Sequence, residues 1–388
     1  MKLALLKDNP LNPGHLPAFA TWDPAPKVGV WQAPAVAASK RRQADFAAQG
    51  MTLEPMSGAS PVGSWMRNTL QRLGMASEDK MPDVALANCD LLHSWELYSD
   101  ATALALTAKQ QWDIPLCVSV WDNVPFALER NPARRRRKER AVAEADFMLV
   151  HDPAARAMLE DAGVPAARIF TCDPGLDTDR YAPGARARQR YGLALDDFVL
   201  LVVGRRLPAK AIELLLLVLR ELCHDTTLHR KRKLRLWFVG VGNEKARIQA
   251  RARQLGVASR CAFTPPLSYT QMPSAYRSAD VVVLPPAPPE CREEYIMHAL
   301  EAMACATPVV AADDDSYAAF TEAAAARCPT DDISALHHTL RRFVLEHAYS
   351  RNYGSRGRKQ ILHRFDRIPF SRFLETRYRD WVAMHRRT

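Results

Sequence analysis

Two glutamates, Glu293 and Glu301, have a residue type and a spacing that suggest chemistry in this sequence. A helix is expected to begin near Tyr295 or Ile296, so that Glu293 lies just before it and Glu301 about two turns inside it. Eight residues of helix rise about 12 Å, comparable with the span from a sugar across a diphosphate to a ribose. One carboxylate could therefore bind a sugar and the other a ribose. The alternative is that Glu293 and Glu294 are acids that complement the dipole at the start of the helix, and that Glu301 is solvated.

Three further residues, Gly204, Arg205 and Lys210, follow an apolar run that is expected to be a strand. Gly204 permits a sharp turn where backbone and ligand approach each other. Arg205 and Lys210 would place two positive charges beside that turn, as a diphosphate requires. An arginine and a lysine in a loop before a helix are also commonly solvated, so both interpretations stay open.

Several polar and aromatic residues in the first half could contact an acceptor. His93 and Glu96 lie at an expected strand end, where they could bind an acceptor or satisfy local polar groups. Asp122 ends a strong strand, at the edge where ligands of α/β proteins bind. Trp95 and Trp121 could stack on a sugar, or simply pack in the core.

The secondary structure around these residues decides where they lie. Short apolar runs alternate with helical patterns along the chain, which predicts βαβ units and parallel sheets covered on both faces. In the first half the expected strands are 2–6, 52–55, 91–93, 116–120, 147–150 and 169–172, and the expected helices are 35–49, 101–111, 132–143 and 153–162. In the second half they are strands 198–203, 234–239, 281–284 and 309–311, and helices 212–223, 244–255 and 297–304.

A turn-rich segment, 173–184, separates the two series. The fold class is therefore expected to be α/β, with two Rossmann-like domains that face each other across a central cleft holding the ligand. The expected domains are 1–184, 185–365 and a C-terminal helix, 366–388, that packs back on the N-terminal domain.

The composition is that of a globular protein, with 48% hydrophobic and 25% charged residues. Eight scattered cysteines without a Cys-x-x-Cys pair give no zinc or redox motif, and no apolar run is long enough for a signal peptide or a membrane span. A cytoplasmic location is expected. The net charge of +10 includes two basic runs, 134–138 and 229–233. Solvated faces are the simpler explanation, peripheral contact with an anionic membrane is the second, and nucleic-acid binding is not expected.

Taken together, these residues resemble the retaining GT-B glycosyltransferases of family 4, also called group 1. The resemblance rests on two motifs. Gly204-Arg205 and Lys210-Ala211 stand where the family has a Gly-Arg-Leu turn and a Lys-Gly pair. Glu293 and Glu301, followed by residues 302–311, stand where the family has a glutamate pair of the same separation followed by Ala-Met-Ala-Cys-Gly-x-Pro-Val-Val-Ala. Ala211 and Ala306 stand where the family has glycines.

The resemblance implies a role for each site residue. Arg205 and Lys210 would neutralise the departing diphosphate, Glu293 would position donor-sugar hydroxyls and Glu301 would bind the ribose. The expected catalytic residues are Glu293, Arg205, Lys210 and Asp122, and the expected donor-binding residues are Gly204, Arg205, Lys210, Glu293, Tyr295, Ile296, Met297 and Glu301. The possible acceptor side comprises Gly14, His93, Glu96 and Trp121, with Gly14 in the loop where the family has paired glycines. No metal and no cofactor besides the nucleotide sugar is expected.

The function implied is transfer of a sugar from a nucleotide-diphosphate donor to a glycan, lipid or small-molecule acceptor, with retention of anomeric configuration. The chain would thus be an enzyme of the hexosyltransferase type. A nucleotide-sugar epimerase shares the fold, but the glutamate pair with its Ala-Met-Ala-Cys tail favours transfer. The alternative from another class is a glycosyltransferase-like subunit that binds a nucleotide sugar and has weakened catalysis. The residue types leave the donor base, the sugar, the acceptor and the oligomeric state open.

Overall fold

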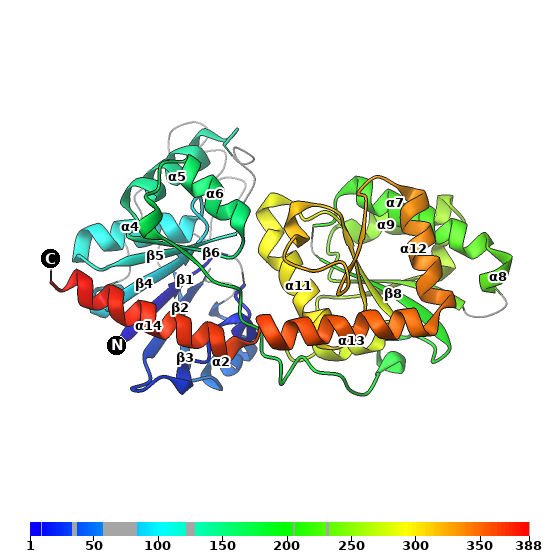
Figure 1. Ribbon diagram of the computed structural model, residues 1–388, viewed down its shortest axis with the longest axis horizontal. Helices are drawn as coiled ribbons and strands as arrows, with labels where there is room; N and C mark the ends of the chain where they lie inside the picture. The colour runs from blue at the N-terminus through cyan, green and yellow to red at the C-terminus, as the bar shows by residue number, and fades with distance from the viewer. Residues whose placement is uncertain are drawn as a thin grey trace. The chain divides into compact units, whose positions relative to one another are not determined.

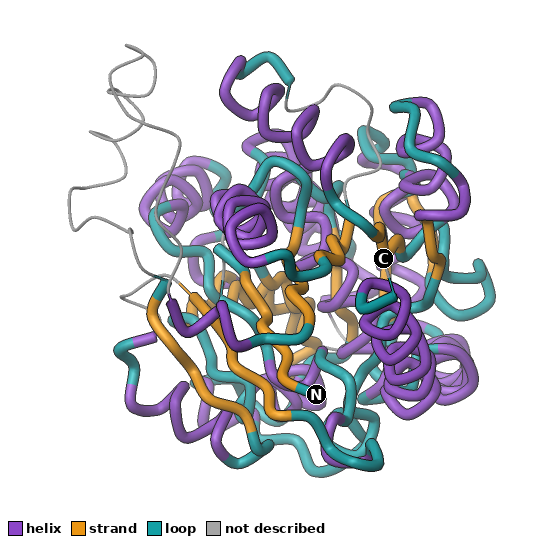
Figure 2. Tube along the Cα trace, turned by 90° about the vertical axis from the view of Figure 1, so that its left-hand side faces the viewer, coloured by secondary structure: helices purple, strands orange, loops and turns teal. Residues whose placement is uncertain are grey.

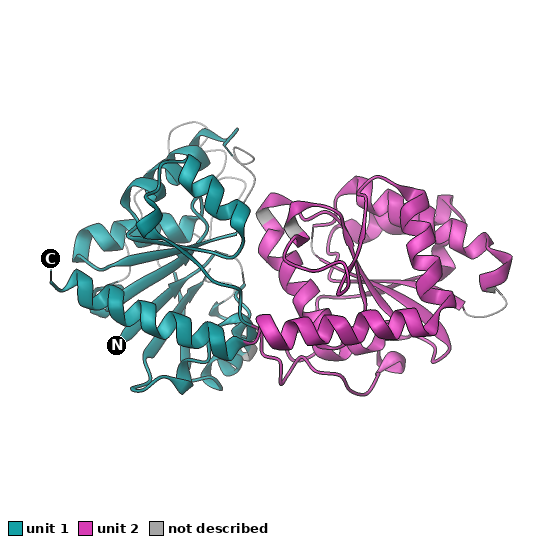
Figure 3. Cartoon of the chain, in the orientation of Figure 1, with its two compact units in different colours: residues 1–175, 367–388 teal, residues 176–366 magenta. Residues whose placement is uncertain are grey.

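The computed structural model describes residues 1–8, 10–32, 37–56, 84–121, 129–204, 206–229 and 233–387. The chain divides into two compact units, of which unit 1 comprises Met1–Gly175 with Arg367–Thr388 and unit 2 comprises Leu176–Asp366 (Figure 3). Most of the turn-rich segment therefore belongs to unit 2. Each unit is a layered α/β structure with its own parallel sheet, as the fold class expected from the sequence requires.

Unit 1 is built on a seven-stranded sheet in the order β3-β2-β1-β4-β5-β6-β7. All of its strand pairs are parallel. Its strands are β1 (Lys2–Leu6), β2 (Lys27–Gln32), β3 (Met51–Pro55), β4 (Leu91–Trp95), β5 (Leu116–Val120), β6 (Phe147–Val150) and β7 (Ile169–Thr171). The order reverses between β1 and β4, which is the arrangement of a doubly wound sheet with a topological switch point.

Helices lie on both faces of this sheet, α4, α5 and α6 on one side and α14 on the other (Figures 1 and 2). The helices of unit 1 are α2 (Lys40–Ala47), α4 (Asp100–Trp112), α5 (Pro132–Glu144), α6 (Pro153–Asp161) and α14 (Arg367–His385). Successive side chains of β4 point to opposite faces of the sheet. Ser94 accepts a hydrogen bond from Thr102 of α4, whereas the neighbouring His93 bonds to Tyr378 of α14.

Unit 2 repeats the plan with six parallel strands in the order β10-β9-β8-β11-β12-β13. Its strands are β8 (Asp197–Val203), β9 (Lys233–Val239), β10 (Cys261–Thr264), β11 (Val281–Leu284), β12 (Val309–Ala312) and β13 (Ala326–Cys328). Its helices are α7 (Ala209–His224), α8 (Thr226–His229), α9 (Glu244–Gln254), α10 (Met272–Ser278), α11 (Arg292–Ala304), α12 (Ile333–Leu345) and α13 (His347–Arg364). All seven residues of β8 are buried, as a central strand covered on both faces must be.

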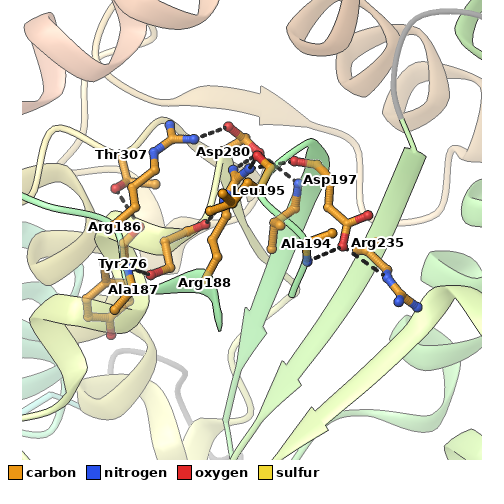
Figure 4. Close-up of polar contacts among 12 residues, drawn as sticks. Arg186, Ala187, Arg188, Ala194, Leu195, Asp197, Arg235, Tyr276, Asp280 and Thr307 are labelled. Carbon is orange, nitrogen blue, oxygen red and sulfur yellow. Dashed lines mark hydrogen bonds and ion pairs between the residues drawn. The ribbon is translucent and has the colours of Figure 1, made fainter. Parts of the chain in front are cut away.

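A buried ion pair between Arg188 and Asp280 connects the segment before β8 to the sheet of unit 2 (Figure 4). The guanidinium of Arg188, which is 3% exposed, lies 2.5 Å from a carboxylate oxygen of Asp280 and donates to the carbonyl oxygens of Leu195 and Asp197. The same Asp280 oxygen accepts a hydrogen bond from the backbone N–H of Val199. Because each buried charge has several partners, the cost of removing it from water is offset. The pair holds the beginning of β8 in place.

The sequence predicted most of the strands. The expected strands at 2–6, 116–120, 147–150 and 281–284 are confirmed without change. The strands β2, β10 and β13 were missed; each begins with a charged or polar residue or spans three or four residues only. In the ranges that the structure describes, no helix combines the length and the apolar character that crossing a membrane requires.

We predict that Gly354→Ala destabilises unit 2. A Cβ atom at position 354 would lie 2.3 Å from the carbonyl oxygen of Ala306, so α13 could not keep its place beside the turn after α11. Overpacking of this kind costs about 1–3 kcal/mol, more than the roughly 0.5–1 kcal/mol that alanine gains over glycine inside a helix. Denaturant unfolding measures the effect, with the exposed neighbour changed by Ser355→Ala as control. A variant as stable as the control would contradict this packing.

Candidate functional site

Helix α11 begins at Arg292, earlier than the sequence predicted. Glu293 therefore lies in the first turn of the helix and not before it, which corrects the expected start near Tyr295. The acid is tolerated there because it complements the positive end of the helix dipole. The N-cap residue, Cys291, makes no side-chain capping hydrogen bond. The first turn thus presents backbone N–H groups of the kind that bind phosphate.

The loop after β8 touches the start of α11 through Tyr295. The Tyr295 hydroxyl, in a fully buried side chain, donates a hydrogen bond of 2.9 Å to the carbonyl oxygen of Arg206. Gly204 has a φ of +146°, and a Cβ atom there would lie 3.0 Å from the same hydroxyl. The backbone conformation favours glycine, and the contact adds to this because a Cβ atom would force the Tyr295 hydroxyl to shift. Two of the predicted donor-site residues, Gly204 and Tyr295, are therefore brought together.

Lys210 lies in the first turn of α7, which follows the same loop. Its side chain is exposed, and its amino group is 2.7 Å from a carboxylate oxygen of Asp331. An exposed pair of this kind contributes only about 0–1 kcal/mol, so an incoming phosphate could take its place. The predicted partner of Lys210, Arg205, lies outside the described residues.

Glu301, the predicted ribose-binding residue, is 1% exposed. Its carboxylate accepts a hydrogen bond of 2.5 Å from the hydroxyl of Tyr276 on α10. The Nδ1 atom of His298 lies 3.3 Å from the same oxygen. The alternative of a solvated Glu301 is therefore wrong, because the carboxylate is held in a buried polar cluster.

Ile296 and Met297 follow Tyr295 in α11 and are buried, like most of this helix. Arg292 precedes them and is only 5% exposed. Its Nε and Nη1 atoms have no hydrogen-bond partner within the part of the chain that the structure describes. Buried guanidinium nitrogens normally have partners, so Arg292 adds an unsatisfied positive charge at the start of α11.

On the acceptor side, the structure brings Glu96 and Trp121 together. Glu96 follows β4 with a φ of +65°, and its carboxylate accepts a hydrogen bond of 3.2 Å from the backbone N–H of Trp121. The Trp121 ring packs on His151, with ring centroids 4.1 Å apart. A non-glycine residue in the left-handed region at a strand end marks a strained position of the type found at functional sites. Asp122, the next residue along, lies outside the described residues.

The other two acceptor-side residues lie elsewhere. His93 is inside β4, which continues to Trp95, so the expectation that it lies at the strand end is wrong. Its Nε2 atom lies 2.7 Å from the Ser119 hydroxyl, and burial lowers the pKa of His93 to about 3. Gly14 is buried in a 3-10 turn, where its N–H donates to the Asn12 side chain at 3.0 Å.

Sequence reasoning missed His298, Tyr276 and Arg292. The spacing did contain a signal for His298, since it stands four residues after Glu294 and three before Glu301, which places all three on one side of a helix. Tyr276 lies on α10, a short helix that was not predicted. Its position beside Glu301 follows only from the folding of unit 2.

We predict that Gly204→Ala destabilises the chain by more than Gly192→Ala. Both glycines have positive φ, but a Cβ atom at Gly192 meets nothing within 4 Å, so this control measures backbone strain alone. The difference should shrink when Tyr295→Phe removes the hydroxyl, giving a coupling of about 0.5 kcal/mol or more in a double-mutant cycle. Urea unfolding of the four combinations measures it. Additive effects would show that the contact does not constrain the loop.

Comparison with known proteins agrees with this arrangement. Residues 185–360 match the family described as Glycosyl transferases group 1. A D-inositol 3-phosphate glycosyltransferase of Geodermatophilus obscurus is 36% identical over 239 residues, which are 58% of this chain and 52% of that protein. The chain thus spans about half the length of the first curated relatives it matches.

A second relative is matched over more of its length. The D-inositol 3-phosphate glycosyltransferase of Saccharomonospora viridis is 33% identical over 318 residues, which are 77% of this chain and 72% of that protein. HepE of Anabaena, solved in complex with UDP-glucose, has a similar fold with a TM-score of 0.74 at 17% identity, over 98% of this chain and 99% of that chain. The GT-B fold class is confirmed by such neighbours. The chain belongs to the group 1 glycosyltransferases.

Proposed function

We propose that this chain transfers a glycosyl group from a nucleoside-diphosphate sugar to a hydroxyl of its acceptor. The observation that carries the proposal is the contact of Tyr295 with Gly204 and Arg206, because it places the loop after β8 beside the start of α11. Helix N-termini and glycine turns are suited to bind phosphate. The diphosphate is proposed to bind at backbone N–H groups of the first turn, which begins at Arg292. The N–H groups of Tyr295, Ile296 and Met297, expected from the sequence to hold it, are used in hydrogen bonds within the helix that starts there.

The proposed catalysis is electrostatic. As the bond from the sugar to the diphosphate breaks, negative charge grows on the departing phosphate. Lys210 and Arg205 are proposed to stabilise that charge from the loop side, and the buried guanidinium of Arg292 adds to the positive potential at the start of α11. Charges fixed before the reaction need no reorganisation, so they lower the barrier more than water would.

The two glutamates are proposed to orient the rest of the donor. Glu293, in the first turn, would bind hydroxyls of the donor sugar, and Glu301, two turns later, would bind the ribose. A hydrogen bond from a ribose hydroxyl to the charged Glu301 carboxylate would be worth about 1.5–3 kcal/mol. Retention of the anomeric configuration and a role of Asp122 toward the acceptor complete the proposal and rest on the family resemblance.

The comparisons guide the choice of substrates for a test. UDP-glucose is bound by HepE, and D-inositol 3-phosphate appears in the names of both relatives. We propose a hydroxylated small-molecule acceptor of that type as the first to assay, with lipid and glycan acceptors next. The strained Glu96 beside Trp121 is the proposed place of the acceptor in unit 1.

We predict that one nucleoside diphosphate among UDP, GDP, ADP and TDP raises the unfolding temperature selectively. A ligand at a hundred times its dissociation constant stabilises the folded chain by about 2.7 kcal/mol. Glu301→Gln and Glu293→Gln should weaken binding of the matching nucleotide sugar about tenfold or more, while Glu139→Gln, on the exposed side of α5, should not. Thermal shift and release of the nucleoside diphosphate measure binding and transfer.

The outcomes of this experiment separate the two function classes. Binding with turnover that is lost in the glutamate variants supports a transferase. Selective binding without turnover with any acceptor would instead favour the subunit that binds a nucleotide sugar and has weakened catalysis. Absence of binding to every nucleotide, or equal binding by all three variants, would contradict the proposed donor site.

A further inference from the structure

His298 stands between two carboxylates on one side of α11. Its Nε2 atom lies 3.8 Å from a carboxylate oxygen of Glu294, and its Nδ1 atom lies 3.3 Å from one of Glu301. The side chain of His298 is 15% exposed and that of Glu301 is 2% exposed. A histidine thus joins the first turn of α11 to the residue proposed to bind the ribose.

The hydrogen bonds among Tyr276, His298 and Glu301 indicate which imidazole nitrogens of His298 carry a proton. The hydroxyl of Tyr276 gives its single proton to Glu301 and also lies 2.9 Å from Nδ1 of His298. Because that proton is used, Nδ1 must carry a hydrogen and donate it. Among the residues that the structure describes, the buried Nε2 atom has no hydrogen-bond partner, and it lies 3.8 Å from a carboxylate oxygen of Glu294. A lone pair there would be repelled by the carboxylate, whereas an N–H is attracted.

The electrostatic environment of His298 agrees with this assignment of protons. Burial by itself would lower the pKa of His298, but the carboxylates of Glu294 and Glu301 outweigh it and raise the pKa to about 9. The groups that face the imidazole are Glu294 and Glu301 from its own helix and Tyr276 from α10, whose own hydroxyl is kept protonated by burial. At neutral pH the cluster therefore holds an imidazolium.

A positive charge at this place has a consequence for the donor. Helix α11 carries Glu293 and Glu294 in its first turn and the buried Glu301 two turns later. Three carboxylates would repel that ligand, although each is useful for binding hydroxyls. One imidazolium lowers the net negative charge and holds the Glu301 carboxylate in one orientation.

We propose that His298 is a positioning residue of the donor site, which as an imidazolium orients Glu301 toward the ribose and compensates the carboxylates of α11. The inference rests on the proposed function, because it takes Glu301 to bind the donor.

The pH dependence has a definite sign. The pKa in the folded chain, about 9, is above the ordinary value of 6.5. The imidazolium is therefore present at neutral pH and is lost as the pH rises through about 9. Affinity of the wild-type chain for the nucleoside diphosphate should fall as the pH rises through the same value. In His298→Gln, which keeps a donor but has no titratable group, the fall should be absent.

The experiment compares His298→Gln with the control His338→Gln, at an exposed position of α12. Dissociation constants for UDP, GDP and ADP are measured by calorimetry from pH 6 to 10, and KM and kcat for the nucleotide sugar at pH 7. We expect His298→Gln to raise the dissociation constant and KM about tenfold at pH 7, with a smaller change in kcat, and to flatten the pH profile. The control should behave as wild type.

Unchanged affinity and an unchanged profile in His298→Gln would overturn the inference, provided that the wild-type chain binds a nucleotide. If the wild-type chain binds none, the proposed function itself fails. Should His298→Gln not fold, Tyr276→Phe and an NMR titration of the wild-type imidazole decide. Titration of His298 near pH 9, shifted by the nucleotide, and weaker binding by Tyr276→Phe support the inference. Titration below pH 7 contradicts it.

Discussion

The close approach of Tyr295 to Gly204 is the constraint on which the candidate donor site depends. A Cβ atom at position 204 would lie 3.0 Å from the Tyr295 hydroxyl, which donates a hydrogen bond to the carbonyl oxygen of Arg206. Tyr295 thus ties Gly204 and Arg206, on either side of the turn, to the first turns of α11. A site whose parts are held together before a ligand arrives loses less free energy on binding.

Charge balance explains the rest of the site. Helix α11 starts with two acids, which the helix dipole favours, and it carries a third acid in a buried cluster. These carboxylates suit hydroxyl groups of a sugar and a ribose but oppose a diphosphate. Two positive groups belong to the same helix, namely Arg292 at its first position and His298 beside Glu294 and Glu301. Lys210 adds a third in the first turn of α7. Hydroxyl recognition and phosphate binding can then share one helix.

Sequence reasoning succeeded where patterns are local and failed where tertiary contacts decide. The strand before Gly204 and the separation of Glu293 from Glu301 could be read from the residues, because apolar runs and helix geometry are local properties. The start of α11 could not, since the prolines before it allowed several starting points. Tyr276 and the buried state of Glu301 were inaccessible, because they arise from the packing of α10 on α11. His298 was accessible through its spacing and was overlooked.

A crystal structure of the chain with UDP, or with whichever nucleoside diphosphate binds, tests the proposed donor site most directly. We expect the phosphates within hydrogen-bond distance of backbone N–H groups in the first turn of α11 and beside Gly204, with the ribose hydroxyls on the Glu301 carboxylate. A nucleotide bound only at another place in unit 2, or only in unit 1, would contradict it.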